Sequence, residues 1–144
     1  MTVETVLLLH FLAAVVMTAV IWFVQVVQYP LFAKIGEAEF PAYAAEYQWR
    51  IGWIVIGPML TEVFTAAALA VFHPGIYKHP AFAIAAVLLA VVWASTFVGL
   101  VPLHQKLLQG KDLATIARLV KSNWLRTIAW TARAILVGWV LWRR

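Results

Sequence analysis

The sequence predicts an all-α integral membrane protein, a four-helix bundle with two short interfacial helices. Of its 144 residues, 65% are hydrophobic and only 12% are charged, a composition outside the range of ordinary soluble domains. Four apolar stretches are each close to the ~20 residues that a helix needs to cross a bilayer. With short loops they nearly fill the chain, so we expect one transmembrane domain over residues 1–144. The expected spans are about 6–28, 51–72, 81–101 and 123–142.

The fourth stretch contains a charge that needs a partner. Asn123, Arg126, Trp130 and Arg133 recur at the spacing of a single helical stripe, and Arg133 lies near the middle of the span. An arginine at that depth costs roughly 2.5 to 3.5 kcal/mol on insertion scales unless a partner or water meets it. Glu62 is the only acid in the middle of another apolar stretch. We therefore expect Glu62 and Arg133 to form the ion pair that organises the bundle.

The first stretch reads as a retained helix. No basic segment precedes it and no small-residue cleavage site follows it, as they would in a signal peptide. His10, Gln25 and Gln28 fall on one helical face, which we expect to point inward because polar groups in lipid need partners. Tyr29 and Pro30 are expected to end the helix.

Two segments have the pattern of surface helices. Residues 31–50 contain three acids together with an aromatic stripe at helical spacing, and residues 113–121 have one basic and one apolar face. Asp112 stands where an N-cap is needed for the second of these. We expect both helices to lie on the membrane surface.

Prolines mark the second and third stretches. Pro58 precedes Glu62 by about one turn and should bend the helix there, because it removes a backbone donor and crowds the preceding turn. The third stretch has no charge, so we expect it to be the most lipid-exposed. Pro102 should end or kink it.

Basic residues predict the orientation. Seven lie near the two long loops and three at the opposite side, so the positive-inside rule puts the long loops in the cytoplasm and both termini outside a bacterial cytoplasmic membrane. The net charge of +5 then reflects loops facing anionic lipid head groups and not a nucleic-acid partner. The seven are Lys34, Arg50, Lys106, Lys111, Arg118, Lys121 and Arg126, and the three are Lys78, Arg143 and Arg144.

Threading the spans antiparallel brings polar residues from all four into one cytoplasmic layer above the central pair. Such a layer could hold the polar head of a quinone, a lipid or a small acid, with Arg126 as anion donor and His104 as hydrogen-bond partner. The alternative is that these side chains only satisfy one another. The candidate ligand-binding residues are Gln25, Gln28, Tyr29, Gln48, Arg50, Glu62, His104, Asn123, Arg126, Trp130 and Arg133.

Metal and covalent chemistries have little support. His10, His73 and His79 should collect at the opposite mouth, where zinc, copper or haem is the weaker alternative, but no two of them have the helical i, i+4 spacing. The absence of cysteine excludes disulfides, thiolate metal sites and thiol nucleophiles. No glycine-rich phosphate loop or nucleophile elbow is present.

Four sequence blocks carry a resemblance. YPLF (29–32), GPMLTE (57–62), VPLH (101–104) and NWLRTIAWTAR (123–133) resemble a family of small, uncharacterised bacterial four-span integral membrane proteins. The similarity covers nearly the whole chain and implies the same fold, but no activity. Members of that family often have a histidine near the position of Gln48, and this departure argues against a metal or proton-relay role for the polar layer. In outline the chain is also similar to anthrone-oxygenase-like membrane proteins.

Three classes of function remain open. The leading one is non-enzymatic: binding a small amphipathic ligand or lipid, or docking as an accessory subunit on other membrane proteins or on a second copy through the third stretch. The second is a membrane oxidoreductase acting on a quinone-like or aromatic substrate. The third is a small proton-coupled transporter using Glu62, although Arg133 at similar depth would keep that acid ionised.

Overall fold

The computed structural model describes residues 2–144, which are helical apart from short turns and contain no strand. The all-α fold class is therefore confirmed. Several of the helices follow one another without a break, so that α1, η1 and α2 form one segment and α4, η3 and α5 another. The elements are α1 (Val3–Phe23), the π-helical turn η1 (Val24–Gln28), α2 (Tyr29–Phe32), α3 (Phe40–Phe72), the 3-10 helix η2 (Pro74–Lys78), α4 (Pro80–Ala94), the π-helical turn η3 (Ser95–Leu100), α5 (Val101–Leu107) and α6 (Leu113–Trp142).

Three of these segments are long and apolar enough to cross a membrane by length and composition. They are Val3–Phe32, Phe40–Phe72 and Pro80–Leu107. The helix α6 has a comparable length of 30 residues but falls outside this group, because it carries Arg126 and Arg133 within its apolar part. The chain is thus compatible with a membrane protein.

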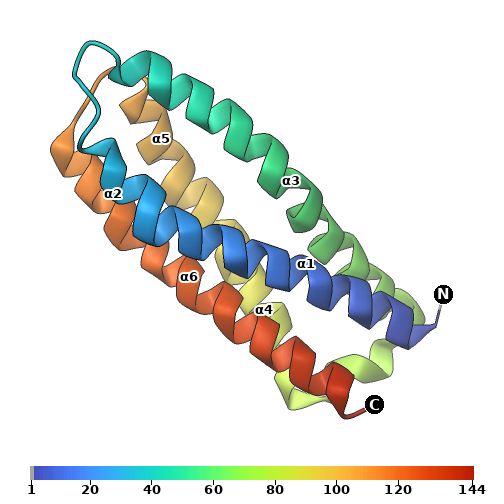
Figure 1. Ribbon diagram of the computed structural model, residues 1–144. Coiled ribbons are helices and arrows are strands. Elements are labelled where there is room, and N and C mark those ends of the chain that lie inside the picture. The colour runs from blue at the N-terminus through green and yellow to red at the C-terminus, as the bar shows by residue number, and fades with distance from the viewer. Residues whose placement is uncertain (1) are drawn as a thin grey trace.

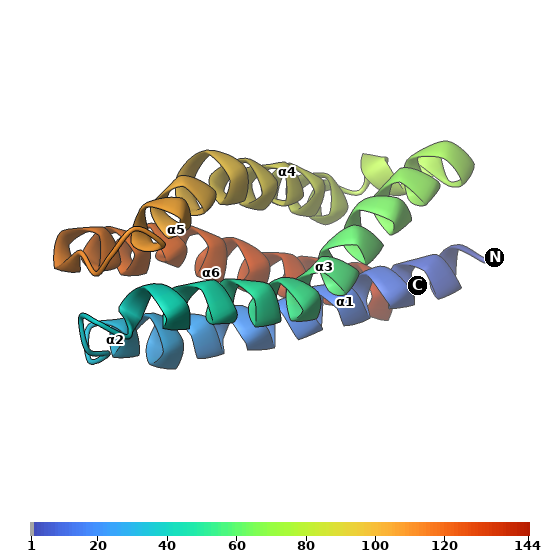
Figure 2. The ribbon, with the colours of Figure 1, turned by 90° about the horizontal axis from the view of Figure 1, so that it is seen from above.

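The segments lie side by side, with both termini at one end of the molecule and the α2–α3 and α5–α6 turns at the other (Figure 1). Helix α1 packs against α3 and α6, and α6 also packs against α4, whereas α3 and α4 make little direct contact. Figure 2 shows the same arrangement from above, with α3 over α1 and the α4–α5 segment over α6. One side of the molecule, between α3 and the α4–α5 segment, is therefore the least closely packed.

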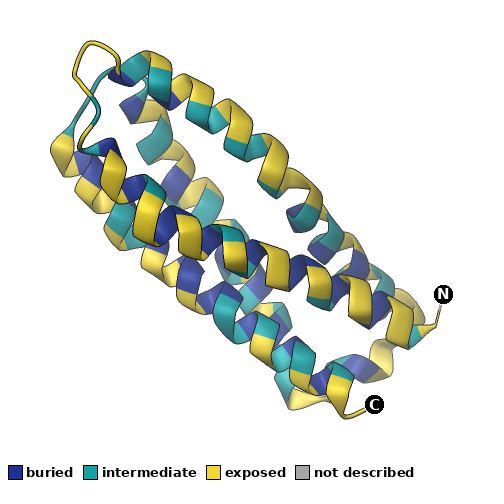
Figure 3. Cartoon of the chain, viewed as in Figure 1, coloured by how far each residue is buried: buried dark blue, intermediate teal, exposed yellow. Residues whose placement is uncertain are grey.

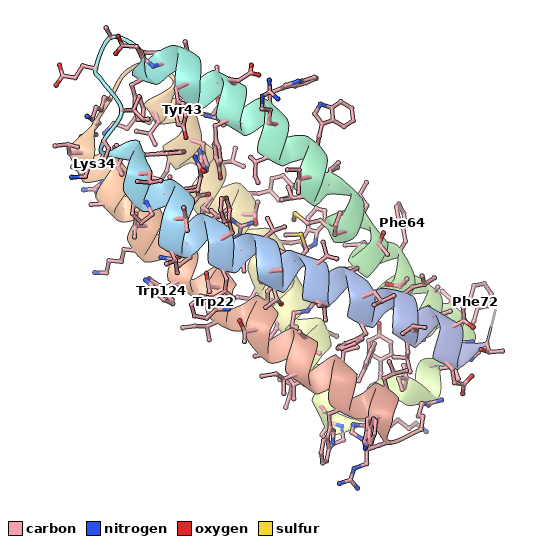
Figure 4. The ribbon with its side chains drawn as sticks, in the orientation of Figure 1. Trp22, Lys34, Tyr43, Phe64, Phe72 and Trp124 are labelled. Carbon is pink, nitrogen blue, oxygen red and sulfur yellow. The ribbon has the colours of Figure 1, made fainter. Side chains whose placement is uncertain are left out.

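The buried faces point inward (Figure 3), and the exposed outer faces carry many large hydrophobic side chains. Phe64 and Phe72 project from α3 away from the other helices (Figure 4) and are 66% and 74% exposed. Trp22 and Trp124 meet edge to face on the outer surface, with ring centroids 5.7 Å apart. Exposed apolar side chains of this kind suit a lipid environment.

The prediction of two separate interfacial helices is wrong. Each of the two segments is the first part of a longer helix. Helix α3 already begins at Phe40 and α6 at Leu113. The apolar stripes pack against each other at the loop end of the molecule, where Phe32, Phe40 and Leu119 are all fully buried in one cluster. On α6, Ile116 and Val120 pack in or against this cluster, whereas Leu113 and Ala117 stay exposed.

Asp112 caps α6 as expected. Its carboxylate accepts hydrogen bonds from the backbone N–H of Ala114 at 3.1 Å, from Thr115 Oγ1 at 2.5 Å and from Lys106 Nζ at 2.7 Å. The donors Lys106 and Thr115 hold the pKa of Asp112 well below its usual value. The cap fixes where α6 begins and so sets the register of its buried polar residues.

Pro30 does not end its helix, contrary to expectation, and the third segment also continues past Pro102, which was expected to end or kink it. A proline inside an α-helix clashes with the carbonyl four residues earlier, and here each proline follows a wider π-helical turn. The N–H of Tyr29 binds the carbonyl of Val24, and that of Val101 binds the carbonyl of Thr96, both five residues back. The widened turns let both helices continue, to Phe32 and Leu107.

Pro58 lies within the continuous helix α3. Figure 2 shows α3 bending near the middle of its length, where Pro58 stands in the sequence. The predicted bend is present, and it carries the second part of α3 toward η2 and the start of α4.

Candidate functional site

Glu62 of α3 and Arg133 of α6 form an ion pair in the interior, as the sequence predicts. Arg133 Nη1 donates to Glu62 Oε1, and 0% of either side chain is exposed. The other carboxylate oxygen accepts a hydrogen bond from Trp130 Nε1 at 3.0 Å, and Arg133 Nε donates to the carbonyl of Ala85 in α4 at 3.0 Å. Both buried charges are thus compensated and hydrogen-bonded.

His10 of α1 completes the network. Arg133 Nη2 lies 3.2 Å from His10 Nε2, and His10 Nδ1 lies 2.7 Å from Thr65 Oγ1. Since a guanidinium N–H can only donate, Nε2 is the acceptor and Nδ1 carries the proton. Thr65 accepts from Nδ1 and donates to the carbonyl of Thr61 at 2.5 Å. The pattern therefore corresponds to a neutral histidine of one tautomer.

We call this set of residues the central network: His10, Glu62, Thr65, Trp130 and Arg133. It connects α1, α3, α4 and α6 through groups that are buried and paired. A carboxylate that must bind and release protons needs access to water or to a relay, whereas both oxygens of Glu62 are occupied by Trp130 and Arg133. The arrangement suits a structural tie better than a proton-coupled carrier.

A second polar group lies nearer the loop end, on α6 and η1. Asn123 Nδ2 donates to Gln25 Oε1 at 2.9 Å, and Gln25 Nε2 donates to the carbonyl of Val120 at 3.2 Å. Arg126 Nη1 donates to Asn123 Oδ1 at 3.1 Å. The guanidinium of Arg126 also lies 4.9 Å from the centroid of the Trp130 ring, which links this group to the central network.

A cavity of about 210 Å³ lies beside Arg126, on the loosely packed side of the molecule between α3 and the α4–α5 segment. Its polar lining residues are Tyr29, Tyr47, Gln48, Thr96, His104, Gln105 and Arg126. The rest is mainly apolar and includes Met17, Val20, Ile21, Val24, Ile51, Val55, Leu100 and Val101. A mainly apolar pocket with a few convergent polar groups is the usual form of a small-molecule site.

The polar residues of the cavity are held in place by one another. Tyr29 Oη and His104 Nε2 are hydrogen-bonded at 2.9 Å, and Gln48 Nε2 donates to the carbonyl of His104 at 3.1 Å. The ring of Tyr47 stacks on that of His104, with centroids 6.2 Å apart. These contacts connect α5 to α2 and α3 across the cavity.

Arg126 is incompletely satisfied. Among residues 2–144, only three buried side-chain polar atoms have no hydrogen-bond partner, and two of them, Arg126 Nε and Tyr47 Oη, belong to the cavity. The side chain of Arg126 is only 6% exposed, and no carboxylate of the described residues lies within 4.0 Å of it. A buried cation with a free donor beside a cavity is the chemistry of a site for an anion or a hydrogen-bond acceptor.

Both π-helical turns border the same cavity. Val24 of η1 and Thr96 and Leu100 of η3 are among its lining residues. Such turns are often found at functional sites, because the extra residue widens the helix and redirects side chains. Tyr29 and Val101, which come directly after the two turns, also line it.

The structure divides the predicted polar layer into three parts. Tyr29, Gln48, His104 and Arg126 line the cavity, Gln25 and Asn123 support Arg126, and Glu62, Trp130 and Arg133 belong to the central network. The remaining two residues lie elsewhere. Arg50 is exposed and pairs with Glu46 at 2.6 Å, and Gln28 donates to Tyr43 outside the lining.

The predicted cluster of three histidines is not formed. His10 is bound in the central network, whereas His73 and His79 flank η2, and no group of His, Asp or Glu residues within 2–144 is arranged to hold a metal ion. His10 was not expected beside Arg133, because it lies four residues inside the start of the expected first span (6–28), whereas Arg133 lies nine residues inside the end of the expected last span (123–142). Tyr47 was missed because its segment was assigned to a surface helix.

Comparisons of the chain with family models, with curated proteins and with solved structures found no match. The function must therefore be argued from the geometry.

Proposed function

We propose that the chain is an integral membrane protein in which α6 crosses the bilayer beside the three apolar segments, as a four-helix transmembrane bundle. The neutralisation of Arg133 by Glu62 supports this, because a paired and buried charge does not have to meet lipid. The long loops face the cytoplasm and both termini face outward, in line with the distribution of basic residues.

We further propose that the protein binds a small amphipathic ligand in the cavity, with the ligand's head group against Arg126. The observation that carries this is the buried Arg126, whose Nε lacks an acceptor and which has no carboxylate partner. A carboxylate or carbonyl oxygen of a ligand would supply the acceptor, and Tyr47 Oη offers a second hydrogen bond.

The size and walls of the cavity limit the ligand. A dry cavity of about 150 Å³ holds a benzene molecule, so 210 Å³ accommodates one substituted ring or the carboxyl end of a chain. Ile51 and Val55 of α3 and Val101 of α5 are apolar lining residues on the loosely packed side. A ligand tail would pass between them into the bilayer, so the fitting classes are a quinone and a fatty acid or other lipid.

The test is a calorimetric titration of detergent-purified protein with decanoate and, separately, with a short-chain benzoquinone. Arg126→Gln should weaken binding of the fitting probe about tenfold or more, because a hydrogen bond to a charged group contributes about 1.5–3 kcal/mol. The matched control is Arg143→Gln, an exposed residue directly after the end of the same helix. Equal binding by the two variants, or no binding of either probe by the wild type, would contradict the proposal.

A second candidate is an oxidoreductase acting on a quinone-like or aromatic substrate. The hydrogen-bonded pair Tyr29–His104 favours it, since both residues line the cavity and could exchange protons with a substrate oxygen. Three measurements test the oxidoreductase hypothesis. They are a visible absorption spectrum and a metal analysis of the purified protein, and an assay of quinone reduction by the Tyr29→Phe variant. A colourless, metal-free protein that reduces no quinone would leave the binding function alone.

A further inference from the structure

A second, larger groove lies on the outer surface between the α4–η3–α5 segment and α6. Its volume is about 850 Å³, and none of its lining residues except Leu100 belongs to the cavity of Arg126. Its walls include Val91, Val98 and Leu125, of which Val98 is 81% exposed. The groove is therefore an apolar surface that the chain itself leaves open.

The shape of the groove results from small side chains at η3. Ala94, Ser95 and Gly99 lie along it, and a Cβ atom added to Gly99 would meet nothing within 4 Å. On the α4–α5 side it extends from Val91 to Leu103, which at 1.5 Å per residue is about 18 Å. Half of a hydrocarbon core is about 15 Å thick, so one acyl chain of one leaflet matches its length.

Positive charge is confined to one end of the groove. Arg118 and Lys121 stand three residues apart on α6, close to the end at which α6 begins. Both are exposed, and no acid of the described residues lies within 4.0 Å of either, whereas the neighbouring Lys106 is paired with Asp112. The end of the groove that has the charge is the end at the membrane surface in the proposed topology.

We propose that this groove binds one anionic phospholipid, with the phosphate between Arg118 and Lys121 and one acyl chain along η3 and α4. A charged head next to an apolar channel of leaflet length is complementary to this lipid class in both charge and shape. A second copy of the chain fits less well, because a symmetric parallel contact would bring the two basic pairs together. The proposal rests on the membrane topology above and is independent of the ligand at Arg126.

The experiment measures lipid retention by native mass spectrometry. Delipidated full-length protein in dodecyl maltoside is titrated with dioleoyl phosphatidylglycerol or dioleoyl phosphatidylcholine. The wild type should retain one phosphatidylglycerol in preference to phosphatidylcholine. The double variant Arg118→Gln/Lys121→Gln should weaken phosphatidylglycerol retention about thirtyfold, at the usual contribution of a basic residue near an anionic lipid surface, and abolish the preference.

Two further variants separate the groove from general surface charge. Gly99→Leu should fill the groove and lower retention of both lipids, whereas Gly52→Leu, at an equally open helical glycine on α3, should leave retention unchanged. Lys34→Gln/Lys78→Gln removes two exposed charges outside the groove and should also have no effect. The Arg118/Lys121 variant should bind the probe that fits the cavity as the wild type does, because neither residue lines the cavity, which distinguishes failure of this proposal from failure of the cavity proposal.

Three results would overturn the proposal. If Gly99→Leu and the Arg118/Lys121 variant both retain phosphatidylglycerol as well as the wild type does, the groove does not hold the lipid. An equal loss in the Lys34/Lys78 variant would show that net charge alone attracts it. If the wild type is a dimer and Gly99→Leu is a monomer, a second copy of the chain occupies the groove.

Discussion

Arg126 and Arg133 are the same residue type on one face of α6, seven residues apart, yet they have different surroundings. Arg133 has a partner for each of Nε, Nη1 and Nη2, and one of these is a carboxylate. Arg126 donates through Nη1 to Asn123 and lies over the face of Trp130, but its Nε has no partner and no carboxylate pairs with it. A fully paired buried charge stabilises one arrangement of helices, whereas an incompletely paired one retains capacity for a ligand.

The first prediction concerns the central pair. Arg133→Met should destabilise the protein by about 3–5 kcal/mol, because Glu62 is left as an uncompensated buried charge. Glu62→Gln should also destabilise it, since Arg133 then loses its anion. The double variant should lose much less than the sum, because no unpaired charge remains. The measurement is denaturant unfolding in detergent for the two single variants and the double variant.

The control for this cycle is Arg143→Met, which removes an exposed arginine directly after the end of α6 and should change stability by less than about 0.5 kcal/mol. Additive losses in the cycle, or single variants as stable as the wild type, would show that the ion pair does not set the helix arrangement.

At the residue scale, the sequence predicts the roles of charged residues that are rare in their surroundings. Glu62 and Arg133 were identifiable because each is an unusual charge in an apolar stretch. The exposed position of Arg50 could not be foreseen, because the sequence does not tell whether an arginine at a span boundary turns inward or pairs with Glu46 one turn earlier on its own helix.

At the scale of the elements, proline and amphipathicity were ambiguous signals. Pro30 and Pro102 normally argue for a helix end, but a π-helical turn before each proline removes the clash, and nothing in the local sequence indicates that turn. An amphipathic stripe next to a span has the same pattern whether it faces lipid head groups or another helix. The answer depends on Phe32, Phe40 and Leu119 meeting across the loop end, which is a tertiary contact.

The second prediction tests that contact. Leu119→Ala should destabilise the protein by about 2–5 kcal/mol, because Leu119 is fully buried and its loss leaves a cavity between α2, α3 and α6. Leu113→Ala, in the first turn of the same helix, should change stability by less than about 0.5 kcal/mol, since Leu113 is 61% exposed. If α6 instead begins as a free surface helix, the two substitutions will have similar small effects in denaturant unfolding.

At the scale of the whole molecule, the composition sufficed for the all-α class and for three membrane-competent segments, because both follow from long apolar runs. The cavity could not be predicted in this way. It lies where α3 and the α4–α5 segment make little contact, and residues of both π-helical turns line it. Only Tyr29, Gln48, His104 and Arg126 among its lining residues were marked in advance by polarity.

The third prediction concerns orientation. The chain has no cysteine, so a single introduced cysteine reports one position. Glu37→Cys, in the turn between α2 and α3, should be protected from a membrane-impermeant maleimide in intact bacteria expressing the protein. Gly75→Cys, in η2, should react, and its Cβ has open space around it. The reverse labelling pattern would place the termini in the cytoplasm.

The central claim is that Arg126 is left without a carboxylate because a ligand supplies its partner. The most direct measurement is a density map of the protein isolated with lipid from native membranes. The account predicts density from a non-protein molecule in the cavity, within hydrogen-bond distance of Arg126, that is lost in Arg126→Gln. A cavity closed by the protein's own side chains or filled only with water, with Arg126 Nε bonded to its own chain, would contradict it.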